Sequence, residues 1–361
     1  MGEVKKQIKN SRCLVAGGSG FIGARIVNSV LDGGAKEVII LGRTIGSIKN
    51  SRVRYVICDL TQEQSVAIIK NLGVFDYVFN LIGLTDQRMP HPNPMELFNA
   101  NVLTLIHLTQ GIAWDSVVGA VHAGSNAEYG TQPLPHQEDM ALRPTNIYGW
   151  SKADASLYAQ TMTTSGFAKW SVARPFFVYG PGRHTGFVCD LIETLMQGNT
   201  FAIAGNSTRD PIFIDDVAIG FLRLAVCPLA AGQIVNICSG KEVFMARIAE
   251  MVKQKIAKGK VTFTSKSRPG DMLRSRGSIK KLKALTGWSP GMSLSQGLDI
   301  MIKEYNRPHS KLRGIPHGIR GLKSADNGGV ISSIPPSAGL RAGIHPHRRA
   351  AGMNARDNKK I

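Results

Sequence analysis

Short runs of consecutive apolar residues alternate, over the first half of the chain, with longer stretches in which apolar residues recur every three or four positions. The short runs predict buried strands, and the longer periodic stretches predict helices. The predicted strands are Cys13–Ala16, Val38–Leu41, Val53–Cys58, Tyr77–Leu81, Val117–His122 and Trp170–Ala173. Strands that alternate with helices pair in parallel through crossover connections. We therefore expect an α/β fold, built on a doubly wound parallel sheet of the Rossmann type.

The first predicted strand is followed directly by a glycine-rich turn and then by a helical pattern. Glycines stand at positions 17, 20 and 23, around Phe21 and Ile22. Gly17 permits a tight turn, Gly20 lets backbone amides approach a pyrophosphate, and Gly23 lets the helix pack close to the strand. An ordinary glycine turn would show the same spacing. The strand before it and the helix after it favour a dinucleotide site that includes Phe21 and Ile22.

Tyr148 and Lys152 form a Y-x-x-x-K spacing on a predicted helix, Ile147–Ser165. A tyrosine is a poor base at neutral pH, and a cation one helical turn away favours the phenolate, so we expect Lys152 to lower the pKa of Tyr148. Ser125 is the natural hydroxyl to orient a substrate oxygen beside Tyr148. A surface pair on a helix would look the same, but the dinucleotide turn favours a redox catalytic set.

Further helices are expected at Asn99–Gly111, Phe187–Gln197 and Phe244–Lys255. The strand and helix rhythm loosens after Gly180-Pro181-Gly182. The predicted division is a nucleotide-binding domain over 8–180, to which 211–240 returns, a smaller substrate-binding subdomain over most of 181–305, and a basic tail over 306–361. The tail is rich in Gly, Pro, His and Arg without periodicity, so we expect it to be disordered.

The net charge of the chain does not by itself distinguish an enzyme from a nucleic-acid-binding protein. The net charge is +19, but residues 306–361 alone hold 11 Lys/Arg against two Asp/Glu. The remaining positive charge suits an enzyme that binds a dinucleotide and a second anion as well as it suits a nucleic-acid binder. The five cysteines lack metal-ligand spacing, and we expect no metal. No segment is apolar enough to span a membrane and the polar start lacks a signal, which predicts a cytoplasmic protein.

Many separate sequence blocks occur in the order found in one family, from about Arg12 to Tyr305. Beyond the glycine turn and the Tyr148 motif, they are Asp59-Leu60, Asn101-Val102, Ser125 with Tyr129-Gly130, Arg174-Pro175, Tyr179–Gly182, Arg209-Asp210, Phe213–Val217, Asn236-Ile237, Arg268–Asp271 and Gly287–Pro290. On these residues the chain resembles an extended short-chain dehydrogenase/reductase of the NAD(P)-dependent nucleotide-sugar epimerase/dehydratase family. The resemblance implies that Ser125, Tyr148 and Lys152 are catalytic.

The same resemblance implies ligand contacts at four further positions. They are Asp59 at the adenine, Leu60 in the cofactor site, and Arg209 and Arg268 near the diphosphate of a nucleotide sugar. The resemblance also places the catalytic Lys152 on the nicotinamide ribose. Guanidinium groups suit phosphate because they bind it bidentately. Each position has a plainer interpretation, since Asp59 could cap a turn and either arginine could form a surface ion pair. Phe177 departs from the family, in which an asparagine often contacts the diphosphate.

The end of the second predicted strand bears on the cofactor. NAD-preferring proteins usually carry an acidic residue there, whereas this strand ends in Gly42-Arg43. Because an arginine can pair with the 2′-phosphate of NADP, Arg43 favours NADP(H), with NAD(H) as the alternative.

The expected reaction is hydride transfer to a 4-keto nucleotide sugar. Asn126-Ala127 replaces the Asp-Glu pair of the family's 4,6-dehydratases, which argues against dehydration, and the stretch Ala123–Gly130 is more similar to 4-keto-6-deoxysugar reductases. Two alternatives stay open: a 4-epimerase that retains NAD, and a non-catalytic RNA-binding or scaffold protein.

The resemblance also implies a homodimer built on the Tyr148 helix. Small and apolar residues at Ala153, Ala155, Leu157 and Ala159 would allow close packing there, either on a second copy or on the chain's own core.

Overall fold

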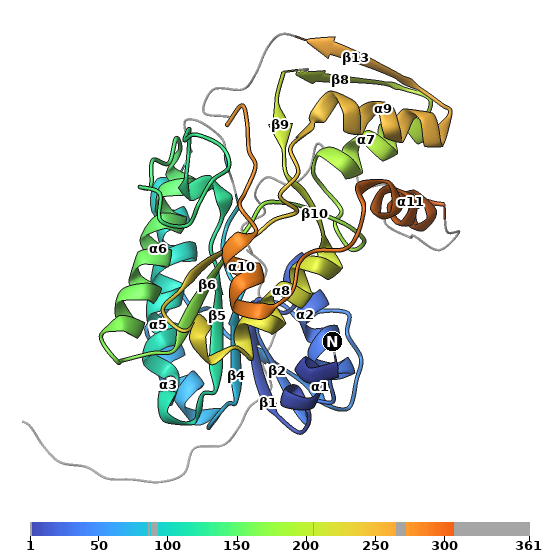
Figure 1. The fold of residues 1–361 in the computed structure, drawn as a ribbon. Coiled ribbons are helices and arrows are strands. Elements are labelled where there is room, and N and C mark those ends of the chain that lie inside the picture. The colour runs from blue at the N-terminus through green and yellow to red at the C-terminus, as the bar shows by residue number, and fades with distance from the viewer. Residues whose placement is uncertain (1, 86, 88–92, 205, 265–271, 307–361) are drawn as a thin grey trace, which may run out of the picture. The chain divides into compact units, whose positions relative to one another are not determined.

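A sheet of seven parallel strands forms the centre of the computed structural model of the chain (Figure 1). The structure describes residues 2–85, 87, 93–204, 206–264 and 272–306. The strand order is β11-β6-β5-β4-β1-β2-β3. The bounds are β1 Arg12–Ala16, β2 Glu37–Gly42, β3 Val53–Ile57, β4 Tyr77–Asn80, β5 Gly119–Ala123, β6 Trp170–Pro175 and β11 Ile234–Ile237. The predicted fold class is confirmed, and each of the six predicted strands is present within two residues at either end.

The sheet is buried on both faces, which explains why its strands are continuous apolar runs rather than alternating ones. In β1, Cys13 and Val15 join one hydrophobic cluster, while Leu14 and Ala16 join the cluster on the opposite face. Successive side chains of a strand point to opposite faces, so each face requires its own cover of helices.

Helices cover the two faces in separate groups (Figure 1). On one face lie α2 Phe21–Asp32 and α8 Ile214–Ala225, with α1 Gly2–Ile8 and α10 Lys280–Thr286 nearby; on the other lie α3 Ser65–Asn71, α5 Thr104–Gly111 and α6 Ile147–Thr164. The predicted helix over 99–111 is longer and less regular. It begins as α4 Pro94–Phe98, passes through a π-helical turn, η1 Asn99–Leu103, and continues as α5.

The remaining elements include three small two-stranded sheets. They are β7 Phe177–Tyr179 with β10 Pro211–Phe213, β8 Thr200–Ala204 with β13 Lys260–Thr264, and β9 Thr208–Arg209 with β12 Val243–Phe244. The helices of this region are α7 Phe187–Met196, α9 Met245–Ile256 and α11 Leu294–Tyr305. Elsewhere in the chain, three short 3-10 helices are described: η2 Trp114–Ser116, η3 Asn126–Glu128 and η4 Pro228–Ala230.

The described residues belong to one compact unit. The predicted division at residues 180 and 305 stays a prediction, and the predicted basic tail lies outside the described residues apart from Asn306.

The contact between β5 and α8 depends on a residue without a side chain. A Cβ atom on Gly119 would lie 1.9 Å from the carbonyl oxygen of Ala225, at the end of α8. We expect Gly119→Ala to lower the free energy of unfolding by about 1–3 kcal/mol, because overpacking forces backbone to move. The measurement is a urea unfolding curve. Gly42→Ala is the matched control, since a Cβ on that strand residue meets nothing within 4 Å; equal losses in both variants would contradict the packing argument.

Candidate active site

The loop between β1 and α2 is a tight turn in which two glycines have no room for a side chain. Gly17 has a φ of +79°, and a Cβ atom there would lie 2.9 Å from the backbone of Leu81 and Ile82. A Cβ atom on Gly23 would lie 2.2 Å from the carbonyl oxygen of Gly17. The first turn of α2 therefore packs directly on the loop, which is the close approach that the glycine spacing predicts.

The N-terminus of α2 is open to an anionic group. Its N-cap, Gly20, has an extended backbone and supplies no side-chain cap. The first amides of the helix, from Phe21, Ile22 and Gly23, have no intrahelical acceptor and can bind phosphate oxygens. The guanidinium carbon of Arg183 lies 5.5 Å from the centre of the Phe21 ring and adds positive charge at this turn. These residues fit the pyrophosphate of a nicotinamide dinucleotide.

The residues at the ends of β2 and β3 are placed for different roles. Arg43 is exposed just after β2. The Asp59 carboxylate accepts hydrogen bonds from Thr61, at 3.0 Å from the amide and 2.8 Å from Oγ1, so it does cap a turn. The Thr61 amide bond is the main reason why the pKa of Asp59 is lowered, and the charge of Arg43 contributes. Leu60 is buried in the core. The adenine contact of Asp59 and the cofactor contact of Leu60 stay predictions.

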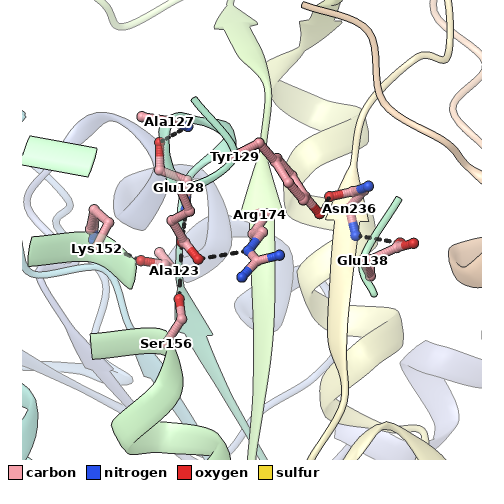
Figure 2. Close-up of polar contacts among 10 residues, drawn as sticks. Ala123, Ala127, Glu128, Tyr129, Glu138, Lys152, Ser156, Arg174 and Asn236 are labelled. Atoms are coloured by element: carbon pink, nitrogen blue, oxygen red, sulfur yellow. Dashed lines mark hydrogen bonds and ion pairs between the residues drawn. The ribbon is translucent and has the colours of Figure 1, made fainter. Parts of the chain in front are cut away.

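The three predicted catalytic residues come from two elements. Ser125 follows the carboxyl end of β5, and Tyr148 and Lys152 lie one turn apart on α6. All three side chains are buried. A hydrogen bond from Ser125 acts on the pKa of the Tyr148 phenol, so the two hydroxyl groups lie together. Lys152 Nζ donates to the carbonyl oxygen of Ala123 at 2.7 Å, which holds its ammonium group against the end of β5 (Figure 2).

Burial, rather than Lys152, dominates the protonation of Tyr148. Burial raises the pKa of Tyr148, while the Ser125 hydrogen bond and the charge of Arg183 act to lower it and the charge of Glu128 acts to raise it. Burial also lowers the pKa of Lys152 to about 8. Burial therefore outweighs the groups that lower the pKa of Tyr148, and the Lys152 ammonium group bonds to Ala123. That Lys152 favours the Tyr148 phenolate stays a prediction.

A buried ion pair that no sequence motif predicted lies next to the predicted catalytic residues. Glu128 and Arg174 lie 2.7 Å apart, with side chains 0% and 1% exposed (Figure 2). Both residues stand inside sequence blocks quoted above, but 46 positions separate them, so no local spacing signals the pair.

The structure also gives Asn101 a role that its sequence block did not reveal. Its side chain lies in the π-helical turn and is fully buried. The Oδ1 atom accepts from the Leu84 amide at 3.0 Å, and Nδ2 donates to Ser151 Oγ at 2.8 Å. A Cβ atom on Gly83 would lie 3.1 Å from Lys152 Nζ. Asn101 therefore holds the loop after β4 against the part of α6 that carries Lys152.

Of the two predicted substrate arginines, the structure describes one. Arg209 lies on β9, and its Nη1 donates to the carbonyl oxygens of Thr208 and Met272, each at 2.8 Å. Its contact with a substrate stays a prediction. Arg268 lies outside the described residues. Phe177 is half-buried and packs edge to face on Phe187, with ring centres 6.4 Å apart.

No helix of the described ranges combines the length and the apolar character needed to cross a membrane. This finding concerns helices only.

Comparison with known proteins gives consistent results over most of the chain. The family model described as the NAD dependent epimerase/dehydratase family matches residues 13–238. The chain is 27% identical to the UDP-glucose 4-epimerase of Mycolicibacterium smegmatis over 302 residues, which cover 80% of this chain and 96% of that protein. It is 29% identical over 246 residues to the GDP-6-deoxy-D-mannose reductase of Pseudomonas aeruginosa, covering 64% and 80% of the two chains.

Among solved structures, MoeE5 in complex with UDP-glucuronic acid and NAD has a TM-score of 0.73 and 27% identity, and the match covers 81% of this chain and 98% of that one. The glycine turn, the buried Ser125, Tyr148 and Lys152, and the extent of these matches lead to one conclusion: the chain belongs to the NAD-dependent epimerase/dehydratase family of nucleotide-sugar enzymes.

Proposed function

We propose that the protein is an NAD(P)-dependent oxidoreductase that reduces a 4-keto nucleotide-diphosphate sugar, with Tyr148 as general acid. The observation that carries this proposal is the burial of Tyr148 beside Ser125. A tyrosine phenol carries its proton at neutral pH, and burial raises the pKa of Tyr148 further, so the phenol is suited to donate a proton. A buried proton donor next to a dinucleotide turn suits the reduction of a ketone.

Each catalytic residue has a distinct part. The nicotinamide cofactor, when bound, supplies the hydride that reaches C4 of the sugar. Tyr148 donates a proton to the C4 oxygen, and Ser125 holds this oxygen by a hydrogen bond. Lys152 contacts the nicotinamide ribose and supplies the positive charge that stabilises Tyr148 after it has lost its proton. Arg209, together with Arg268, is proposed to bind the diphosphate of the substrate.

A 4-epimerase is the second candidate, and the names of the relatives favour it. The same residues would act in both directions: Tyr148 would take the proton of the C4 hydroxyl as the bound cofactor accepted the C4 hydride, and would return the proton to the C4 oxygen as the hydride returned to the opposite face of C4. A match to a relative named UDP-glucose 4-epimerase covers 80% of this chain.

The non-catalytic alternative is disfavoured because Ser125, Tyr148 and Lys152 are all retained. A cytoplasmic location and the lack of nucleic-acid binding stay predictions from the sequence.

Tyr148→Phe tests the catalytic assignment. Loss of the proton donor is expected to lower kcat by about 10²–10⁴-fold and to leave the dissociation constant of the cofactor nearly unchanged. The measurement combines turnover of a panel of 4-keto nucleotide sugars and UDP-hexoses with a fluorescence titration of NADPH and NADH. Tyr158→Phe, on the same helix, is the matched control. Full activity in Tyr148→Phe would overturn the assignment.

Arg43→Ala tests the cofactor preference. If Arg43 binds the 2′-phosphate, the dissociation constant of NADPH rises about 10–100-fold, since a hydrogen bond to a charged group is worth about 1.5–3 kcal/mol, and that of NADH stays the same. Arg54→Ala is the control, because Arg54 is a half-exposed arginine on the neighbouring strand β3. Near-stoichiometric NAD retained by the purified wild-type protein would contradict the reductase and favour the epimerase.

We further propose that α6 forms the interface of a homodimer. Ala153, Ala155 and Ala159 are buried in the chain's own core, whereas Trp150 and Leu157 are about half exposed. The two exposed residues are seven positions apart and therefore lie on one face of the helix. Large exposed apolar side chains on one helix face are typical of an interface.

Light scattering after gel filtration tests the dimer. The wild-type mass is expected to be twice the chain mass of 39.0 kDa, and Trp150→Asp/Leu157→Asp is expected to elute as a monomer, because two buried carboxylates would oppose association. Phe167→Asp, which changes an apolar residue that is 67% exposed just beyond α6, is the control. A wild-type monomer would overturn this proposal without affecting the catalytic one.

A further inference from the structure

The Glu128 carboxylate connects the segment that carries Ser125 to the helix that carries Tyr148 and Lys152. Its Oε1 atom accepts hydrogen bonds from the Ser125 amide at 2.6 Å and from Ser156 Oγ at 2.9 Å. Ser156 lies one turn after Lys152 on α6. One buried carboxylate therefore contacts both elements of the site (Figure 2).

The other carboxylate oxygen of Glu128 is held by Arg174. Arg174 lies on β6 and donates from Nε to Oε2 at 2.7 Å. Its guanidinium carbon also lies 4.7 Å from the centre of the Tyr129 ring, and Tyr129 donates to Asn236 at 2.7 Å. The acceptor atoms of Glu128 are thus satisfied on three sides, and the side chain has one well-defined position.

The segment that carries Ser125 is fixed by a reciprocal pair of bonds. Ser125 is the N-cap of η3, and its Oγ accepts from the Ala127 amide at 3.1 Å while Glu128 accepts from the Ser125 amide. This capping box sets the backbone conformation of the segment that carries the Ser125 hydroxyl. Loss of the Glu128 carboxylate would release one half of the box.

Stability alone does not account for this ion pair. Both side chains are fully desolvated, and a buried ion pair typically contributes little more to stability than an apolar pair of the same size. The negative charge of Glu128 does have an electrostatic consequence, since it acts to raise the pKa values of both Lys152 and Tyr148. Without it, burial would favour neutral Lys152 even more strongly.

We propose that Glu128, held by Arg174, is a positioning residue whose carboxylate fixes the Ser125 segment against α6 and places a negative charge on that helix one turn from Lys152. The proposal deepens the proposed function and rests on it for the roles of these three residues. Glu128 itself does not contact substrate.

The charged and titratable groups around the pair determine the sign of the expected effect. They are Arg174 on β6, Tyr129 after η3, Tyr148 and Lys152 on α6, Arg183 after β7, and Glu138, which accepts from the Asn236 amide. Removal of the Glu128 charge alone leaves the Arg174 cation without its counter-ion. Positive potential then increases at α6, and both Tyr148 and Lys152 lose their protons at lower pH.

A spectroscopic titration tests the electrostatic part without any substrate. Phenolate absorbance is followed against pH in the full-length protein, and the signal of Tyr148 is isolated as the difference between each protein and its Tyr148→Phe counterpart. In Glu128→Gln the Tyr148 midpoint is expected to fall by about one pH unit or more. Glu242→Gln is the matched control, because it breaks another carboxylate–arginine pair, with Arg274, and should leave the Tyr148 midpoint unchanged.

Turnover tests the positioning part. In Glu128→Gln, kcat should fall about 10–100-fold with little change in the KM of the cofactor, and the alkaline limb of the pH profile should move to lower pH. Glu128→Asp keeps the charge but is too short to reach all its partners, so the Tyr148 midpoint should stay near that of the wild type while kcat falls about tenfold.

Two outcomes would overturn the proposal. The first is a folded Glu128→Gln variant with an unchanged Tyr148 midpoint, because a merely structural carboxylate would lower thermal stability without moving that titration. The second, which decides the matter if Glu128→Gln does not fold, is undiminished turnover in Glu128→Asp. A shifted midpoint in a protein that turns over no nucleotide sugar would support the role of Glu128 and reject the proposed reaction, so the two failures are distinguishable.

Discussion

The common direction of the seven sheet strands is the constraint on which the candidate site depends. Because the strands are parallel, their carboxyl ends meet at one edge, and the segments that follow them meet there as well. The turn at Gly17 follows β1, Asp59 follows β3 and Ser125 follows β5. The crossover helices that parallel pairing requires also bring α6, with Tyr148 and Lys152, to the same edge. The site is thus a consequence of the topology, and its residues need not be close in sequence.

Burial at that edge determines the chemistry that the residues can perform. Desolvation raises the pKa of Tyr148 and lowers that of Lys152 to about 8, so both shifts reduce the charge that each side chain carries near neutral pH. Glu128 acts against the second shift and strengthens the first. After burial, Glu128 therefore contributes to the charge balance of the site, although it is proposed to touch no reactant. Its partner, Arg174, pairs with that carboxylate at 2.7 Å in a place where an isolated buried carboxylate would be costly.

The sequence predicted those parts of the structure that depend on neighbouring residues. The strands were predicted because they are apolar on both faces, and the turn because only glycine fits at positions 17 and 23. The catalytic set was predicted because Tyr148 and Lys152 are one helical turn apart. The Glu128–Arg174 pair and the bonds of Asn101 could not be predicted, since their partners come together only through the sheet and its crossovers. The net upward shift of the Tyr148 pKa was not predicted, because sequence spacing shows a nearby cation but not the burial that raises the pKa.

The distinction between reductase and epimerase depends less on the catalytic residues than on how firmly the cofactor is held. In the proposed mechanisms both reactions use Tyr148 as acid or base, in the same buried site. An epimerase needs its reduced cofactor to stay bound while the keto sugar rotates in the site, and this requirement favours many contacts around the dinucleotide. A reductase must exchange cofactor in each cycle, which favours an accessible site with a strong recognition group for the phosphate of NADPH. An exposed arginine at the end of β2 suits the second requirement, whereas the relatives named as epimerases, and the NAD in the MoeE5 complex, suit the first. Because the proposed role of Tyr148 is common to both reactions, the contacts made to the cofactor, rather than the catalytic set, have to separate them.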